Sequence, residues 1–210
     1  MTPPRGRPVD EEKQAEQKQN LIDAAKELMA EKGYRSITIR ELGERANTNP
    51  AMVKYYFENK EGLFVALLDR MAGEHFAALQ AIQSSEKPIK ALIHHMLAML
   101  SENNGMARMI HDEILHNQSG LREAFIDRFP KRMAKFLPLL IKTELNVEDP
   151  KVAKYLAFNL VSLIITPHIG EPVRKLAWRI SDEELKDPYW AEHIYQMFIN
   201  GARSFAKNWS

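Results

Sequence analysis

Residues 38–64 constrain the fold more than any other stretch, because they encode two short helices separated by a tight polar turn. Thr38 and Glu41 have the spacing of a capping box, which marks the start of a helix. Residues 47–49 (Asn-Thr-Asn) favour a turn, since such side chains hydrogen-bond to their own backbone. Asn49 can then cap a second helix that has Pro50 at its first position. This order of elements predicts a helix-turn-helix.

The same stretch resembles the DNA-binding motif of the TetR family of transcriptional repressors, closely over about residues 15–70 and elsewhere only by helix count and length. The resemblance is carried in register by Ile37, Thr38, Ile39, Ala46, Tyr56, Phe57, Asn59, Lys60 and Glu61. The turn departs from the Gly-Val-Ser that the family often has, and Lys54 stands where the family often has Tyr. The resemblance implies an all-α homodimer of about nine helices per chain, with an N-terminal three-helix DNA-binding domain and a C-terminal helical domain for ligand binding and dimerisation.

The motif also implies which side chains contact a double-stranded DNA operator. By position we expect phosphate contacts from Arg35, Thr38, Tyr55, Tyr56 and Lys60, and base reading by Asn49, Ala51 and Lys54 beside Pro50. Lys54 can donate to guanine, and Ala51 can contact a thymine methyl group. Lys60 is unfavourable at a helix N-terminus unless an anion such as a phosphate faces it; the alternative is a solvated lysine.

The expected domain organisation follows from these assignments. Residues 1–9 are rich in Pro, Gly and Arg and are expected to be a disordered basic arm. In it, Arg5 and Arg7 either reach a DNA groove or stay solvated. Residues 10–58 are expected to form the DNA-binding domain, with a fourth helix starting at Lys60, and residues 59–210 the effector-binding and dimerisation domain.

The pattern remains helical to the end of the chain, without a strand signal. Apolar periodicity predicts helices at about residues 10–32, from residue 60 onward, and at 88–104, 106–118, 121–145, 151–168 and 189–208. Pro130 and Pro138 must kink or divide the helix over 121–145. Residues 170–187 are expected to be a connection with a capped turn at Ser181.

The last two long helices predict a dimer interface. The helix over residues 151–168 is apolar almost all round, so it must be covered on every side. Two such helices from each subunit are expected to form a four-helix interface through Leu156, Leu160, Leu163, Trp190, Ile194, Phe198, Gly201 and Phe205. The alternative is that these faces are the core of one subunit.

Methionine and aromatic residues in the middle of the chain predict a ligand pocket, because methionine fills irregular space and adapts to different neighbours. The expected lining residues are His95, Met96, Met99, Met109, Ile110, Ile114, Phe125, Phe129, Met133 and Phe136. The ligand would be a small, largely apolar effector that releases a repressor from a palindromic operator. The alternative is that these residues are only core and that the fold binds DNA without an effector.

Composition excludes several other classes. The absence of cysteine excludes disulfides and thiol chemistry, and the formal net charge of +1 means that any DNA-binding surface is local. We expect no metal, cofactor or catalytic site, since His111 and His116 lack metal-ligand spacing; a helical enzyme using Asp112 and His116 is the remaining alternative. With no apolar run of membrane-spanning length and no signal peptide, we expect a cytoplasmic protein without membrane contact.

Overall fold

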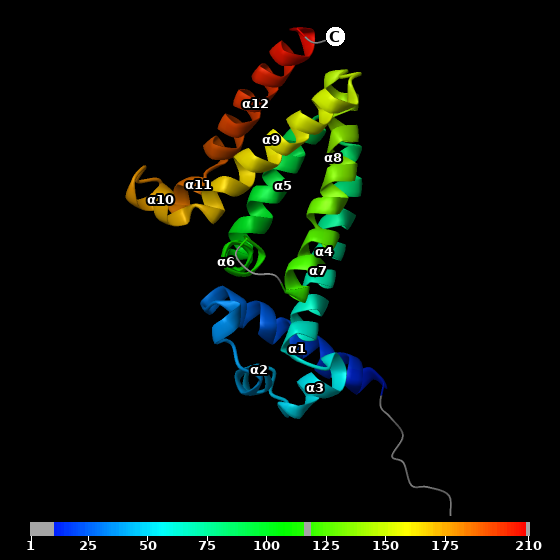
Figure 1. Ribbon diagram of the computed structural model, residues 1–210, viewed down its shortest axis with the longest axis vertical. Coiled ribbons are helices and arrows are strands. Elements are labelled where there is room, and N and C mark those ends of the chain that lie inside the picture. The colour runs from blue at the N-terminus through cyan, green and yellow to red at the C-terminus, as the bar shows by residue number, and fades with distance from the viewer. Residues whose placement is uncertain (1–10, 116–118, 209–210) are drawn as a thin grey trace, which may run out of the picture.

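The computed structural model describes residues 11–115 and 119–208, which form an elongated, layered arrangement of helices (Figure 1). These residues contain twelve α-helices, one 3-10 turn and one π-helical segment, and none of them lies in a strand. The all-α fold class is therefore confirmed. The basic arm, residues 1–9, lies outside the described residues.

The N-terminal head, at the bottom of Figure 1 in blue and cyan, holds the helix-turn-helix. It consists of α1 (Glu11–Glu31), the 3-10 turn (Tyr34–Ser36), α2 (Ile39–Arg45), α3 (Ala51–Phe57) and the first turns of α4 (Lys60–Gln83). The capping box forms as expected: Thr38 Oγ1 accepts from the backbone N of Glu41, and the Glu41 carboxylate accepts from the backbone N of Thr38. Two donors that would otherwise be orphaned are thereby satisfied at the start of α2.

The turn between α2 and α3 depends on a close backbone approach. A Cβ at Gly43 would lie 2.8 Å from the ring Cγ and the backbone N of Pro50, so only glycine permits this contact. Asn47 has a φ of 48°, which asparagine tolerates better than most residues. Helix α3 begins at Ala51, one residue later than expected, with Pro50 before it.

The larger domain is built on α4, which continues out of the head, and on eight further helices and the π-helical segment. In chain order these are α5 (Pro88–Glu102), α6 (Asn104–Met109), the π-helical segment (Ile110–Leu115), α7 (Gly120–Arg128), α8 (Pro130–Leu145), α9 (Pro150–Ile169), the short α10 (Glu171–Leu176) and α11 (Asp182–Lys186), and α12 (Pro188–Asn208). Helices α8 and α9 pack side by side, and α12 lies against α5 and α9 at the far end from the head (Figure 1).

The helix count differs from the expected nine for two physical reasons. The expected helix over 121–145 is divided at Pro130, which starts α8 where no backbone N–H is needed, whereas Pro138 is accommodated inside α8. The expected connection over 170–187 contains α10 and α11. The capped turn expected at Ser181 is the start of α11, where Ser181 and Glu184 form a second capping box.

Buried side chains form two clusters. One cluster joins the head to α6, the π-helical segment and α7, so that Leu42, Val53 and Phe64 share a core with Met106 and Leu121. The other joins α5, α8, α9 and α12. The first cluster means that the head and the middle of the chain pack as one body.

Candidate DNA-binding surface and effector cavity

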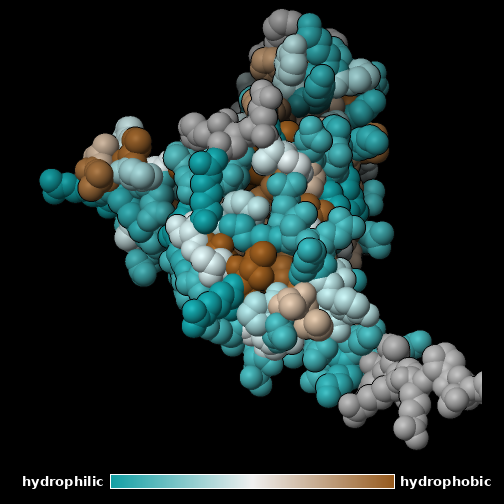
Figure 2. All heavy atoms as spheres, turned by 60° about the horizontal axis from the view of Figure 1, so that its bottom comes forward, coloured by the Kyte–Doolittle hydropathy of each residue, from teal (hydrophilic) through white to brown (hydrophobic). Residues whose placement is uncertain are grey.

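The outer face of α3 carries the residues expected to read bases. Ala51, Lys54 and Tyr55 are exposed at helical spacing, while Val53 and Phe57 on the opposite side are buried. Figure 2 brings the head forward and shows that its surface is mostly hydrophilic. This face therefore offers one ammonium, one phenol and one methyl group to a groove.

Asn49 stands beside this face and is also exposed. Its side-chain oxygen accepts a hydrogen bond from the backbone N of Ala51 at 2.9 Å. The amide NH₂ group then remains as the donor side of Asn49. The structure thus brings Asn49, Ala51, Lys54 and Tyr55 together, and their base and phosphate contacts stay predictions.

Lys60 has an intramolecular role that sequence reasoning missed. Its Nζ donates to the backbone oxygens of Tyr34 and Ile37, at 3.0 and 2.9 Å, and lies 4.3 Å from the centroid of the Tyr34 ring. Burial lowers the pKa of Lys60. Two of its three donors therefore hold the loop before α2, which neither a phosphate ligand nor a solvated lysine would do. A phosphate contact through the third donor stays a prediction.

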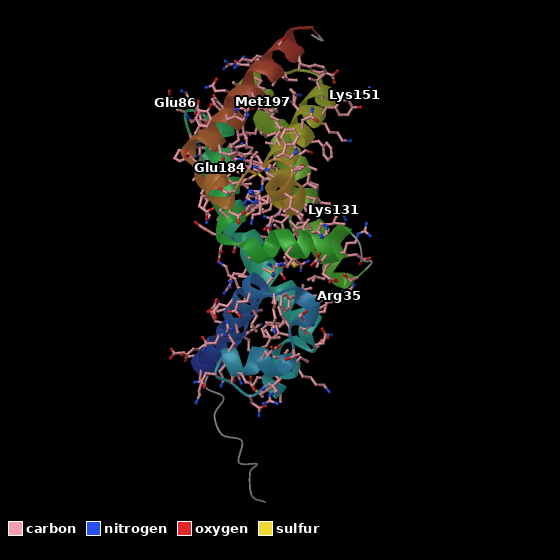
Figure 3. All side chains as sticks on the ribbon, turned by 90° about the vertical axis from the view of Figure 1, so that its left-hand side faces the viewer. Arg35, Glu86, Lys131, Lys151, Glu184 and Met197 are labelled. Carbon is pink, nitrogen blue, oxygen red and sulfur yellow. The ribbon has the colours of Figure 1, made fainter. Side chains whose placement is uncertain are left out.

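Three of the other four expected phosphate contacts also have hydrogen-bond partners within the chain. Thr38 Oγ1 donates to the Glu41 carboxylate at 2.8 Å, and the Tyr56 hydroxyl donates to Gln17 at 2.9 Å. Arg35 Nε donates to Glu113 Oε1 at 2.8 Å, although 68% of the Arg35 side chain is exposed. Figure 3 shows Arg35 where the head meets the larger domain.

A cavity of about 590 Å³ lies in the larger domain, next to the π-helical segment. Of the residues expected to line a pocket, those that do so are Met96, Met99, Ile110, Ile114, Phe125, Phe129 and Met133. Three expected residues do not line it. Met109 is buried in the cluster that joins the head to α6 and α7, and Phe136 packs against the cluster of α5, α8, α9 and α12. His95 does not line the cavity itself but contacts His75, which does.

Sequence reasoning missed the wall that α9 contributes to this cavity, because the all-round apolar character of α9 was interpreted as a dimer surface. Phe158, Val161 and Ile165 of α9 line the cavity together with α8. The cations in the lining are Arg122 of α7 and Lys154 of α9. The chemistry of the cavity is therefore apolar, with cations confined to two positions.

His75 of α4 is the buried titratable residue of the lining, only 3% exposed. Its Nδ1 lies 2.9 Å from Nε2 of His95 on α5, and the two rings are stacked. Burial, together with the charges of His95 and Arg132, lowers the pKa of His75 to about 4. The ring is therefore neutral at pH 7.

The expected dimer interface needs a correction. Leu156, Leu160, Ile194 and Phe198 are buried within the single chain, so they belong to the core of one subunit, as the alternative interpretation held. Leu163 and Trp190 are partly buried against the same core, and Gly201 and Phe205 are exposed.

The exposed apolar residues of α9 and α12 are different ones. Tyr155 and Phe158 are 52% and 72% exposed on α9, and Tyr189 and Met197 are 76% and 50% exposed on α12 (Met197 is labelled in Figure 3). On α12, Met197, Gly201 and Phe205 follow one another in steps of four residues and therefore lie along one exposed strip. This face is the candidate for contact with a second copy.

The described residues contain no group of His, Asp and Glu side chains that could hold a metal ion. His111 Nδ1 lies 2.8 Å from Asp112 Oδ1, and His116 lies outside the described residues. Among the described helices, α9 is long and apolar enough to span a membrane by length and composition alone, contrary to the expectation that no run reaches that length. It packs against α5, α8 and α12, as the core helix of a globular domain does.

The clearest similarity to known proteins lies in the N-terminal head. The family described as "Bacterial regulatory proteins, tetR family" matches residues 21–67, which span the second half of α1, all of α2 and α3, and the first turns of α4. The HTH-type transcriptional regulator YvkB of Bacillus subtilis is 35% identical over 82 residues, which are 39% of this chain and 42% of that protein. The match thus spans less than half of YvkB.

Similarity over the whole length is weaker in sequence and clear in fold. The fatty acid metabolism regulator protein of Bacillus subtilis is 20% identical over 86% of this chain and 93% of its own. The fatty acid degradation regulator FadR from Bacillus halodurans has a TM-score of 0.72 at 16% identity, covering 89% of this chain and 96% of that one. The sequence match of the head and the shared fold agree with the resemblance noted above. Residues 21–67 thus match the TetR family of bacterial regulatory proteins, and the chain as a whole shares the fold of FadR from Bacillus halodurans.

Proposed function

We propose that the protein is a homodimeric, sequence-specific repressor that leaves its palindromic operator when an acyl-chain effector enters the cavity. One observation carries this proposal: the π-helical segment takes part in both sites. Ile110 and Ile114 line the cavity, while Glu113 between them contacts Arg35 of the head. A ligand that displaces this segment therefore acts directly on the DNA-binding head.

In this proposal each expected domain has its own function. Residues 10–58 bind DNA, and residues 59–210 bind the effector and the second subunit. Two copies joined through the exposed face of α12 present two α3 helices, which read half-sites about 34–36 Å apart. Such a regulator works in the cytoplasm, where its DNA is.

The effector class is argued from the cavity and supported by relatives. An apolar cavity with Arg122 and Lys154 in its lining suits an acyl chain with an anionic head group. A FadR of Bacillus subtilis, with a TM-score of 0.68 at 16% identity, was solved in complex with stearoyl-CoA, and AibR, at 0.61 and 16%, with isovaleryl coenzyme A and operator DNA. We therefore propose an acyl-CoA as the effector.

The test has two stages. Selection from random duplex DNA should enrich a two-fold symmetric site, which then serves as the probe for titration with hexadecanoyl-CoA, decanoyl-CoA and free coenzyme A as the control. We expect release by an acyl-CoA and none by coenzyme A. No enriched site with a folded, dimeric sample would refute the DNA-reading function; an enriched site that no acyl-CoA releases would refute only the effector class.

The two alternatives receive less support. A regulator without an effector would be favoured by a tightly packed middle region, and the cavity of about 590 Å³ argues against that packing. The relatives are transcriptional regulators rather than enzymes, and we propose no catalytic role.

A further inference from the structure

One buried polar side chain interrupts the apolar wall of the cavity. His75 is 3% exposed and lines the cavity from α4. Its Nδ1 is occupied by Nε2 of His95 at 2.9 Å. Nε2 of His75 is therefore the ring nitrogen left to interact with a bound molecule.

The surroundings fix the orientation of this ring. It stacks on His95 with 15° between the planes, and Phe76 meets it edge-on with the centroids 4.9 Å apart. Phe129, which also lines the cavity, lies 6.0 Å from it. A ring held on three sides presents Nε2 in a fixed direction, so a ligand does not have to order it.

The histidine pair can offer the cavity either a donor or an acceptor. If the shared hydrogen belongs to His95, then Nε2 of His75 carries a hydrogen and can donate to a carbonyl oxygen. If the shared hydrogen belongs to His75, its Nε2 is an acceptor for a hydroxyl group. Because burial and nearby charges lower the pKa of His75 to about 4, neither state brings a positive charge at pH 7.

An uncharged ring selects an uncharged partner. A carboxylate at this place would be stripped of water without a cation from the ring to replace it. The cations of the lining, Arg122 and Lys154, belong to α7 and α9 rather than to the α4–α5 wall that holds the pair. Arg132 of α8, whose charge also acts on His75, is exposed, lies over the Phe76 ring and does not line the cavity. A plain alkyl chain would leave Nε2 without a hydrogen bond.

We propose that His75 is a specificity-determining residue of the cavity and that the effector carries an uncharged oxygen, a carbonyl or a hydroxyl, within its apolar part. His95 is the positioning residue that fixes the tautomer of His75. The inference rests on the proposed role of the cavity as the effector site and goes beyond an acyl chain, because it requires a polar atom at one place along the chain.

The test uses a pair of short probes that can slide within the cavity and so do not depend on the depth of His75. The first is dibutyl ketone, and the second is its carbon isostere, in which a methylidene group replaces the carbonyl oxygen. Their dissociation constants are measured by displacement of a fluorescent dye from the full-length protein. The variants are His75→Phe, which keeps the ring shape, and His75→Gln, which keeps a donor.

We expect His75→Phe to weaken ketone binding about tenfold relative to the isostere, as for the loss of one buried hydrogen bond, and His75→Gln to restore much of that difference. The carbon-13 resonance of the labelled carbonyl should move downfield in the wild type, relative to its position in cyclohexane, and return in His75→Phe. This resonance tests the proposal in the wild type even if a variant fails to fold.

Two outcomes overturn the inference in distinguishable ways. If both probes bind and His75→Phe changes both dissociation constants equally, or if the carbonyl resonance does not move, His75 is packing and the cavity can still hold a plain chain. If neither probe nor any acyl-CoA binds the folded wild type, the cavity is not a ligand site, and the proposed effector function fails with the inference.

Discussion

Arg35 has an ion-pair partner within the protein and is also an expected phosphate ligand. Its Nε donates to Glu113, whose side chain is buried, while most of the Arg35 side chain is exposed. A buried carboxylate requires a cation or a donor nearby. Because this bond uses Nε, the two terminal NH₂ groups remain as the donors for the expected phosphate contact. We therefore propose that Glu113, from the larger domain, orients the expected DNA contact of Arg35.

We expect Arg35→Ala to weaken binding to all DNA sequences alike and to reduce the salt dependence by about one phosphate contact. Glu113→Gln should weaken DNA binding in the wild-type background and have no further effect in the Arg35→Ala background, because it acts through Arg35. Fluorescence anisotropy over a salt series measures all four proteins of this cycle. Additive losses would show that Glu113 does not act through Arg35.

Lys54 gives the sharpest test of base reading, since it is the exposed cation of α3. We expect Lys54→Ala to lower operator affinity and to relax preference at one base pair by about 1–3 kcal/mol. The matched control is Lys186→Ala, an exposed lysine on α11 outside the head. Competition with operators changed at single base pairs gives the measurement. A uniform loss across all of them would make Lys54 a phosphate ligand.

Among single residues, the sequence predicted the contacts that depend only on close neighbours in the chain. The capping box of Thr38 and Glu41 depends on residues three apart, and it forms as expected. The bonds of Lys60 to the oxygens of Tyr34 and Ile37 depend on how a loop folds back, and no pattern in the sequence encodes that. His75 was missed for a similar reason, because its partner His95 is twenty residues away on another helix.

Helix α6 lies between the cavity and the head, and at Gly105 it packs so closely on the backbone of α1 that no side chain fits between them. A Cβ at Gly105 would lie 2.3 Å from the backbone oxygen of Met29 and 2.8 Å from the backbone N of Ala30, near the end of α1. The neighbouring Met106 lines the cavity. Movement of α6 therefore presses directly on the backbone of the head.

We expect Gly105→Ala to destabilise the fold by about 1–3 kcal/mol, because the backbone of α1 must shift to accept the methyl group. The matched control is Gly73→Ala in α4, where a Cβ meets nothing within 4 Å. That change should stabilise the protein by about 0.5–1 kcal/mol, since alanine favours a helix over glycine. Urea denaturation measures both. Equal stabilities for the two variants would mean that the α1–α6 contact yields at no cost.

The elements themselves were largely predictable, because apolar periodicity and proline positions are local signals. The helices that the sequence did not predict are those that depend on packing against the rest of the chain. Helix α10 is only six residues long, and its Arg174 is buried, donating to the backbone oxygens of Pro167 and Ile180 and to Asp182. That network holds the expected connection over 170–187 in a compact form, which periodicity cannot indicate.

At the scale of the whole molecule, α9 shows why an all-round apolar helix does not identify its partners. Part of its surface meets the core of its own chain, and another part lines the cavity through Phe158 and Val161. The sequence predicted that this helix is covered on every side, whereas Tyr155 and Phe158 are largely exposed in the single chain, and periodicity did not indicate which elements cover the rest. Residues inside one subunit, such as Leu160 and Ile194, were therefore assigned to the interface.

On α12, an experiment can distinguish the exposed apolar residues, which are candidates for the dimer interface, from the buried ones, which belong to the core of one chain. Met197 is 50% exposed, whereas Ile194, three residues before it, is 2% exposed. We expect Met197→Glu to leave the free energy of unfolding of the single chain nearly unchanged and to yield a monomer, because two carboxylates would face each other across a two-fold interface. Ile194→Ala should instead cost about 2–5 kcal/mol of stability.

Operator affinity of the same two variants then links assembly to function. A monomer presents one α3 helix, so Met197→Glu should bind a single half-site as the wild type does and lose the gain from binding both half-sites together, which reaches about a hundredfold for linked modules. Light scattering gives the mass, and titration with full and half operators gives the affinities. A Met197→Glu protein that stays dimeric and keeps full operator affinity would move the interface away from this face of α12.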